Sequence, residues 1–243
     1  MCKIFRDKLA EKTKLSLSIQ TNATLIDDDW IELFQTHEIA VGVSIDGPKI
    51  YNDQYRIDHR GKGTYDRLKI GIDKLFDACK KNKIKEPAAL SVVNPNFSAT
   101  LIYEHLVYDL GFKVLDFLLP DLSYQTISKI ESEKINSFLL DLIYAWKKQD
   151  DPSIHIRILD SIVKKLLTSL RPKPTIKTIN QIISISTNGH VVPNDILRNT
   201  QFWNDKDEFS ILENSLFDIV NSELFTFLRQ SEATIPKNCT DCC

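Results

Sequence analysis

The 243-residue chain has no long apolar run and almost no excess of charge of either sign. No stretch approaches the roughly 20 consecutive apolar residues that a membrane-spanning helix needs. Residues 1–8 carry charge without a following apolar run, which is not the pattern of a secretory signal. The net charge of −2 gives no electrostatic reason to bind nucleic acid or an anionic membrane. We therefore expect a cytoplasmic protein with no nucleic-acid and no membrane partner.

The signature motifs of several enzyme classes are also missing. The sequence contains no G-x-S-x-G, no complete phosphate-binding loop and no G-x-G-x-x-G. The segment 61–64, Gly-Lys-Gly-Thr, lacks the preceding strand and the full spacing of a phosphate-binding loop. Nothing therefore indicates a hydrolase nucleophile or a nucleotide-phosphate site.

Cysteines are few and unevenly placed. Cys2 and Cys79 stand alone, whereas Cys239, Cys242 and Cys243 lie within the last five residues. Such a cluster, in a chain without a secretory signal, is more often a metal or iron–sulfur site than a disulfide framework. Two thiolates separated by two residues can bind one iron or zinc, although an incidental cysteine pair is the alternative. Cys79 lies on an apolar helix face and is interpreted as a core cysteine.

Strand-like and helix-like segments alternate through the first 150 residues. Four strands are predicted, each followed by an amphipathic helix; the strands cover 15–19, 39–45, 88–93 and 114–119. The acidic triplet Asp27-Asp28-Asp29 suits the start of one helix by capping and by the helix dipole, and Thr64 and Ser98 are predicted to cap two others. Four such units in succession predict parallel strands joined by right-handed crossovers, hence an α/β fold.

A proline-containing stretch marks the predicted domain boundary. Arg171-Pro172-Lys173-Pro174 ends the last of these helices, so we place one domain at 1–171 and a second at 172–243. In the second domain, Asn188-Gly189 lies between two short apolar runs and predicts a hairpin with a two-residue turn.

Polar or turn-forming residues follow every predicted strand, in segments 20–22, 44–48, 94–95 and 120–121. Asn, Asp, Gly and Pro often do no more than end strands and form turns. However, ligands of parallel α/β folds bind at the carboxyl ends of the strands, where all four segments meet. Arg56, in the long polar loop predicted over 46–63, can hold a ligand carboxylate with its guanidinium fork; an ordinary solvated arginine is the alternative.

These motifs together resemble radical S-adenosylmethionine enzymes with a C-terminal SPASM module. The closest resemblance is to peptide maturases that form cyclophanes and to anaerobic sulfatase-maturing enzymes. The motifs are Gln20-Thr21-Asn22-Ala23-Thr24-Leu25, Val43-Ser44-Ile45-Asp46-Gly47-Pro48, Tyr55-Arg56, Gly61-Lys62-Gly63-Thr64-Tyr65, Asp116-Phe117-Leu118-Leu119-Pro120-Asp121 and Thr187-Asn188-Gly189 with Pro193, Asp195, Leu197 and Arg198.

The resemblance implies a fold, a reaction and a set of ligands. The fold is a partial (βα)6 barrel, of which the chain holds about the last four units, followed by the start of a SPASM-type module. The reaction is hydrogen abstraction from a ribosomally made peptide by a 5′-deoxyadenosyl radical, with S-adenosylmethionine and a [4Fe–4S] cluster as cofactors. Ser44 and Arg56 are expected to contact S-adenosylmethionine, Arg56 through its carboxylate, while Gln20, Asn22 and Asp46 line the same rim.

Cys239 and Cys242 are the expected ligands of an auxiliary iron–sulfur cluster by the same resemblance. Other family features are missing from the sequence. It has neither the family's C-x3-C-x2-C, which holds the catalytic cluster, nor its Gly-Gly-Glu-Pro segment. Ala23 replaces a family glycine, and Asn194 replaces an auxiliary cysteine.

Three interpretations follow from these differences. The first is a fragment of a radical S-adenosylmethionine peptide maturase that does not generate a radical by itself. The second is a non-catalytic remnant of that barrel that binds a peptide or a partner, and the third is a small zinc-binding α/β protein. A barrel without its first strands leaves a strand edge exposed near residues 15–19, so we expect the isolated chain to aggregate or oligomerise.

Overall fold

The computed structural model describes residues 14–122, 127–169, 182–192 and 209–232, together with Lys3 and Asp7. The chain divides into two units, residues 1–120 with 127–171 and residues 121–126 with 172–243. Each unit has its own sheet and its own hydrophobic core. No helix within the described ranges is long and apolar enough to cross a membrane.

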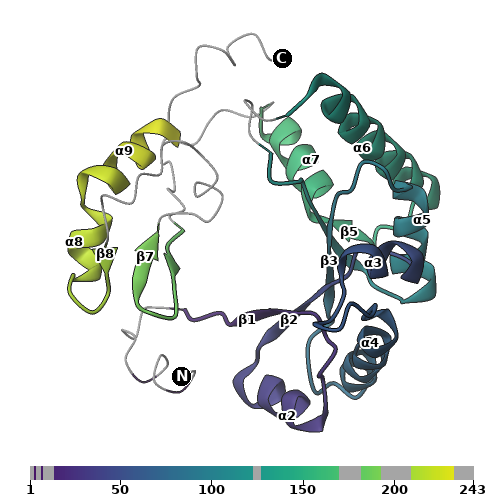
Figure 1. The fold of residues 1–243 in the computed structure, drawn as a ribbon, viewed down its shortest axis with the longest axis horizontal. Helices are drawn as coiled ribbons and strands as arrows, with labels where there is room; N and C mark the ends of the chain where they lie inside the picture. The colour runs from purple at the N-terminus through teal and green to yellow at the C-terminus, as the bar shows by residue number, and fades with distance from the viewer. Residues whose placement is uncertain are drawn as a thin grey trace. The chain divides into compact units, whose positions relative to one another are not determined.

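The first unit is built on a five-stranded parallel sheet (Figure 1). Its strands are β1 (Ser18–Thr21), β2 (Ala40–Ser44), β3 (Ala88–Val92), β4 (Val114–Leu118) and β5 (His155–Ile156), and their order in the sheet is their order in the sequence. All four neighbouring pairs run parallel, which confirms the predicted α/β fold with a parallel sheet. β1 begins at Ser18 rather than near Leu15, because Ser18 is the residue that pairs with Ala40 at the start of β2.

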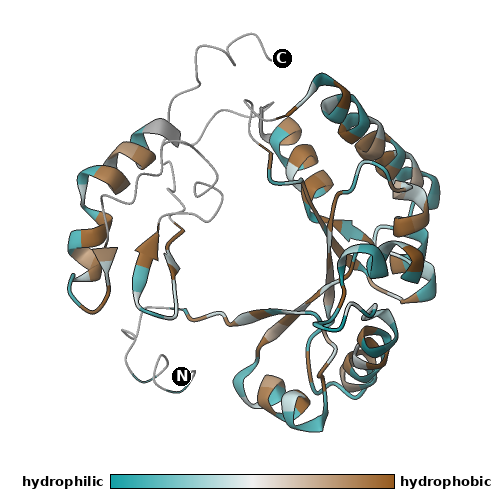
Figure 2. Cartoon of the chain, viewed as in Figure 1, coloured by the Kyte–Doolittle hydropathy of each residue, from teal (hydrophilic) through white to brown (hydrophobic). Residues whose placement is uncertain are grey.

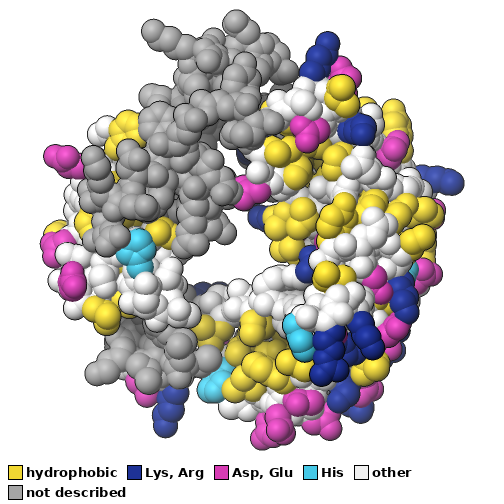
Figure 3. All heavy atoms as spheres, viewed as in Figure 1, with side chains coloured by type: hydrophobic (Ala, Val, Ile, Leu, Met, Phe, Trp, Pro, Cys, Tyr) yellow, Lys and Arg dark blue, Asp and Glu magenta, His cyan; other side chains and the backbone are white. Residues whose placement is uncertain are grey.

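Helices follow the strands and pack against them (Figures 1 and 2). They are α2 (Asp28–His37), α4 (Tyr65–Lys80), α5 (Ala99–Glu104) continued by the π-helical η1 (His105–Asp109), α6 (Lys129–Gln149) and α7 (Arg157–Ser169). In Figure 2 these helices carry hydrophobic and hydrophilic stripes, as amphipathic helices do. Charged side chains of both signs are spread over the helix-bearing side of this unit in Figure 3.

The two faces of the sheet differ, because successive strand side chains point in opposite directions. One face, here called the helix-covered face, holds buried apolar side chains in the same core as the helices: Val41, Val43, Ala89, Leu115 and Phe117. The fully buried Ser91 of β3 is a polar residue on this face. The register places the alternate residues on the other face, here called the polar face: Gln20, Gly42, Ser44, Leu90 and Asp116. The polar face therefore holds the strand residues that the core does not use.

Two of the three predicted caps are confirmed. The side chains of Asp27 and Ser98 accept hydrogen bonds from the first turns of α2 and α5. Thr64 precedes α4 but does not cap it with its side chain; instead its hydroxyl donates to the carbonyl oxygen of Arg56 at 2.9 Å. The carboxylate of Asp53 takes the place of the cap, because it accepts a hydrogen bond from the N–H of Tyr65, the first residue of α4, at 2.9 Å. The Thr64 hydroxyl instead binds the loop that precedes the helix.

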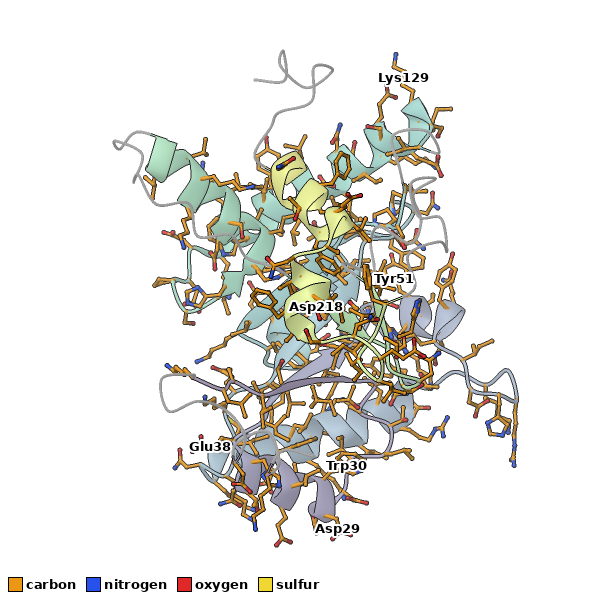
Figure 4. All side chains as sticks on the ribbon, turned by 90° about the vertical axis from the view of Figure 1, so that its left-hand side faces the viewer. Asp29, Trp30, Glu38, Tyr51, Lys129 and Asp218 are labelled. Atoms are coloured by element: carbon orange, nitrogen blue, oxygen red, sulfur yellow. The ribbon has the colours of Figure 1, made fainter. Side chains whose placement is uncertain are left out.

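The loop predicted over residues 46–63 contains a helix that the sequence pattern did not indicate. This helix, α3 (Lys49–Tyr55), follows Pro48, whose fixed φ favours the start of a helix. Seven residues are too few to display an apolar period of 3.6, which explains the wrong prediction. Figure 4 labels Tyr51 on α3, apart from Trp30 and Glu38 at the two ends of α2.

The second unit contains a small antiparallel sheet and two helices. Its strands are β6 (Ser184–Ile185), β7 (His190–Val192) and β8 (Phe209–Ser210), and its helices are α8 (Leu216–Val220) and α9 (Glu223–Glu232). The predicted hairpin is confirmed, but its turn lies one residue earlier than predicted. The N–H of Gly189 donates to the carbonyl of Ser186 at 2.9 Å, and Gly189 itself follows the turn with a φ of +85°. A type I turn closed by a left-handed glycine explains this difference.

Candidate functional site

The side chains of Gln20 and Ser44 meet on the polar face of β1 and β2. Gln20 Nε2 donates to Ser44 Oγ at 3.0 Å. Gly42 is the register partner of Gln20 and leaves the space that the Gln20 side chain occupies, because a Cβ at Gly42 would lie 2.2 Å from Gln20 Oε1. Since the Ser44 hydroxyl accepts from Gln20, its own proton stays available for a ligand.

Asp46 and Arg56 form a two-point ion pair just beyond the carboxyl end of β2. Arg56 Nε lies 2.7 Å from Asp46 Oδ2, and Arg56 Nη2 lies 3.0 Å from Asp46 Oδ1. The Arg56 side chain is 24% exposed and the Asp46 side chain 12% exposed, so the pair is largely shielded from water. The backbone N–H of Val92 also donates to Asp46 Oδ1 at 3.1 Å. Both carboxylate oxygens of Asp46 are therefore occupied, while the guanidinium of Arg56 keeps donors for a ligand.

A buried asparagine holds this ion pair in place. Asn52 of α3 is fully buried, and its Oδ1 accepts from the backbone N–H of Asp46 at 3.4 Å. The carbonyl of Asn52 accepts from the backbone N–H of Arg56 at 2.9 Å. Asn52 was not predicted, because the residue type of an asparagine inside a charged loop does not reveal that it is buried.

Asn22 follows β1 but forms a local turn instead of joining either pair. Its Oδ1 accepts from the N–H of Thr24 at 3.2 Å and from the hydroxyl of Thr24 at 2.9 Å. No hydrogen bond within the described residues links Asn22 to Ser44 or Arg56. The structure thus brings Gln20 together with Ser44, and Asp46 together with Arg56, and leaves Asn22 on the neighbouring loop.

The residue after Asn22 has an unusual backbone conformation. Ala23 is buried and has a φ of +55°, in the left-handed region where glycine is favoured. Its carbonyl oxygen lies against Gly71 of α4, where an added Cβ would be only 1.9 Å away. Alanine in this conformation costs about 1–2 kcal/mol relative to the ordinary region, the strain that a glycine at this position avoids.

Aromatic side chains lie close to the ion pair along the chain. The rings of Tyr51 in α3 and Phe97 after β3 are stacked, with centroids 4.1 Å apart. Tyr55, directly before Arg56, lies with its ring centroid 6.0 Å from that of Phe97 and is largely exposed. These three rings form an aromatic cluster, and one of them directly precedes Arg56 in the sequence.

Metal-binding side chains do not gather in the part of the chain that the structure describes. Within it, no three His, Cys, Asp or Glu residues are placed to hold one metal ion. Cys79 is a half-buried free thiol in α4. Cys239 and Cys242 lie outside the described residues, so their predicted role as iron–sulfur ligands stays a prediction.

Comparison with known proteins relates the chain to sulfatase-maturating enzymes. No protein-family model matches the chain. The chain is 31% identical over 160 residues to the cysteine-type anaerobic sulfatase-maturating enzyme of Clostridium novyi, a match that covers 62% of this chain and 41% of that enzyme. The chain therefore spans about two fifths of the length of that curated relative.

Solved structures share the fold at lower sequence identity. Native anSMEcpe with bound AdoMet has a TM-score of 0.78 and 23% identity, covering 99% of this chain and 66% of that chain. Native anSMEcpe with bound AdoMet and Kp18Cys peptide has a TM-score of 0.75 and 22% identity, with the same coverage. The resemblance drawn from the motifs is confirmed: the chain is similar to part of the radical S-adenosylmethionine, SPASM-containing sulfatase-maturating enzymes.

Proposed function

We propose that the carboxyl edge of the sheet binds S-adenosylmethionine and that the chain serves in a radical S-adenosylmethionine peptide maturase. The observation that carries this proposal is the guanidinium of Arg56, fixed by both oxygens of Asp46 at the carboxyl edge. A guanidinium held in this way loses little rotational freedom when it binds a carboxylate. The similarity to sulfatase-maturating enzymes makes the methionine carboxylate of the cofactor the fitting ligand.

The residues present fit that ligand. Arg56 directs Nε and Nη2 at Asp46, so the rest of its guanidinium can donate to the cofactor carboxylate. The Ser44 hydroxyl, whose lone pair already accepts from Gln20, donates its proton to the same ligand. Asp46 then acts as a positioning residue, because the N–H of Val92 and the guanidinium occupy its oxygens.

The bound cofactor supplies, in this enzyme class, the 5′-deoxyadenosyl radical that removes a hydrogen atom from the peptide. The side chains described here bind and orient the cofactor. The described residues hold no group suited to the reducing cluster, so no redox step is assigned to them. The aromatic surface formed by Tyr51, Tyr55 and Phe97 is the proposed boundary between the cofactor and the solvent.

The fold of a partial barrel is part of the same proposal. Five parallel strands in sequential order support it, because such an order places every crossover helix on the same face of the sheet. The strands β1–β4 then correspond to the last four units of a partial (βα)6 barrel, and β5 is a short additional strand beside β4. The second unit corresponds to the start of a SPASM-type module. Cys239 and Cys242 are the proposed auxiliary-cluster ligands of that module.

Calorimetric titration of the full chain with S-adenosylmethionine tests the proposal. We expect Arg56→Lys to weaken binding by at least about tenfold, because lysine cannot reproduce the two-point contact with Asp46. Arg67→Lys is the matched control, since Arg67 also pairs with an aspartate but lies in α4 outside the site. Equal affinities of the two variants would contradict the proposal. No binding by the unmodified chain would favour the non-catalytic peptide- or partner-binding role.

A further inference from the structure

The first unit holds another aspartate–arginine pair, whose half-buried aspartate lies on the polar face. Asp116 of β4 pairs with Arg157, the first residue of α7: Arg157 Nε and Nη2 both lie 2.6 Å from the same oxygen, Oδ2. The Asp116 side chain is 17% exposed, whereas that of Arg157 is 67% exposed. The hydrogen bond to Asp116 raises the pKa of the Arg157 guanidinium.

The other oxygen of Asp116 has no partner. Oδ1 is buried and forms no hydrogen bond in the described structure. A buried carboxylate oxygen without a donor is destabilising, and most proteins avoid it. An ion pair arranged for stability would turn both nitrogens toward both oxygens, as Arg56 does with Asp46.

A surface pair of similar exposure shows the contrast. Asp58 is 18% exposed and Arg67 50% exposed, and Arg67 Nη2 lies 3.1 Å from Asp58 Oδ2. The remaining oxygen, Oδ1, accepts from the backbone N–H groups of Arg60 and Lys62 at 2.9 and 3.0 Å. These backbone hydrogen bonds lower the pKa of Asp58. Of the aspartate–arginine pairs among the described residues, the one on Asp116 alone leaves an oxygen unsatisfied.

The position of Asp116 relates it to the proposed cofactor site. Ser44, Leu90 and Asp116 are successive partners in the sheet, so Asp116 lies two strand spacings, about 10 Å, from Ser44 on the same face. Arg157 also borders a cavity of about 280 Å³ at the amino ends of β4 and β5, lined in addition by Val114, His155, Asp160, Ser161 and Lys164. Asp116 does not line this cavity, so a ligand on the polar face would reach Asp116 past the exposed side chain of Arg157.

The pair discriminates between ligand groups by charge. A carboxylate would bind Arg157 but would bring negative charge to the unsatisfied Asp116 oxygen. An ammonium group would satisfy that oxygen but would face the guanidinium. A neutral amide satisfies both, with its C=O accepting from Arg157 and its N–H donating to Asp116 Oδ1.

A primary amide fits better than a main-chain peptide group. The C=O and one N–H of a primary amide lie on the same side, whereas a trans peptide group points them in opposite directions. Binding at Oδ1 requires the Arg157 side chain to shift outward with the ligand, and its exposure permits that movement.

We propose that Asp116 and Arg157 form a binding site for the primary amide of an asparagine or glutamine in the peptide substrate. This inference rests on the proposed function for the identity of the ligand as a peptide. Asp116 and Arg157 then determine which residue of the peptide is placed beside the cofactor.

Nuclear magnetic resonance of the full chain tests the site through the Nε–H signals of its arginines. The probes are acetyl-Asn-methylamide, the isosteric charged acetyl-Asp-methylamide, and acetyl-Ala-methylamide, which offers main-chain groups alone. The Arg157 signal is assigned by its loss in Arg157→Lys. We expect the asparagine probe to shift this signal saturably and at least about tenfold more tightly than the other two, the factor that a hydrogen bond to a charged group is worth.

Variants separate binding from folding. Asp116→Asn should abolish the preference for the asparagine probe, while the matched control Asp58→Asn should keep it. Equal shifts by the asparagine and alanine probes would overturn the primary-amide site, and a preference unchanged in Asp116→Asn would do the same. Adding S-adenosylmethionine and following the Arg56 signal reports on the proposed function separately. If Arg56 responds and Arg157 does not, the amide site fails while the cofactor site stands.

Discussion

The two faces of the parallel sheet are made from the same strands but differ in the side chains they carry and in what those side chains contact. On the helix-covered face, Val43, Leu115 and Phe117 are buried in the core with the helices. On the polar face, Ser44 and Asp116 are the next residues along the same strands, and they contact polar partners. A parallel sheet covered by helices on both sides is apolar on both faces. The difference supports the proposal that one face of this sheet serves folding and the other binds a ligand.

Each face carries one buried polar atom without a partner among the described residues: Oδ1 of Asp116 on the polar face and Oγ of Ser91 on the helix-covered face. A buried polar atom without a hydrogen bond lowers stability. The proposed ligand would complete the one on the polar face. A substitution on the helix-covered face should therefore lower stability, whereas a substitution of the neighbouring residue on the polar face should mainly affect ligand binding.

Phe117→Ala should have the largest effect on stability. Phe117 is 2% exposed and packs edge-on against Phe138, so its truncation should cost about 3–5 kcal/mol of the free energy of unfolding. Asp116→Asn, one residue earlier, should change that free energy by less than about 1 kcal/mol, because Arg157 is mostly exposed. Urea unfolding of both variants measures the difference. Similar losses in the two variants would show that the faces do not divide folding from binding.

Alkaline pH should destabilise the helix-covered side. Burial raises the pKa of Tyr103 to about 12, and its hydroxyl hydrogen-bonds to Gln149 of α6. The unfolded chain loses this proton near pH 10, so the contribution of Tyr103 is complete below pH 10 and is lost as the pH rises to 12. The loss should be about 2–3 kcal/mol. Tyr103→Phe should remove this part of the alkaline decline in unfolding experiments, whereas Asp116→Asn should leave it unchanged.

The contact between Ala23 and Gly71 tests how tightly the helix-covered side is packed. Gly71→Ala should cost about 2 kcal/mol, because overpacking against a backbone carbonyl outweighs the gain in helix propensity. Ala23→Gly should change stability by less than about 1 kcal/mol, since relief of the left-handed strain is offset by a lost buried methyl group. Thermal unfolding compares the two. A neutral Gly71→Ala would mean that α4 can move away from the loop.

The sequence predicted those parts of the molecule that depend on local pattern. The alternation of strands and helices followed from apolar periods, and the caps Asp27 and Ser98 followed from residue type beside those periods. The helix α3 and the two-residue β5 were missed, because each is too short to show a period.

The partners within the site depend on contacts between distant segments. The residues at the strand ends were named from sequence, but their pairing was not. Asp116 and Arg157 lie 41 positions apart and meet because β4 and β5 are neighbours in the sheet. Thr64 has the residue type of a cap, but its hydroxyl donates to the carbonyl of Arg56. The N–H at the start of α4 is instead bound by the carboxylate of Asp53. Tertiary packing decided each of these outcomes.

The most direct test of the account compares S-adenosylmethionine with its decarboxylated analogue, titrated into the unmodified chain and into Arg56→Ala. We predict that the unmodified chain binds the carboxylate-bearing ligand at least about tenfold more tightly, and that Arg56→Ala binds both ligands with equal affinity. Equal affinity in the unmodified chain, or a preference that survives in Arg56→Ala, would contradict the assignment of Arg56 as the carboxylate-binding residue of this site.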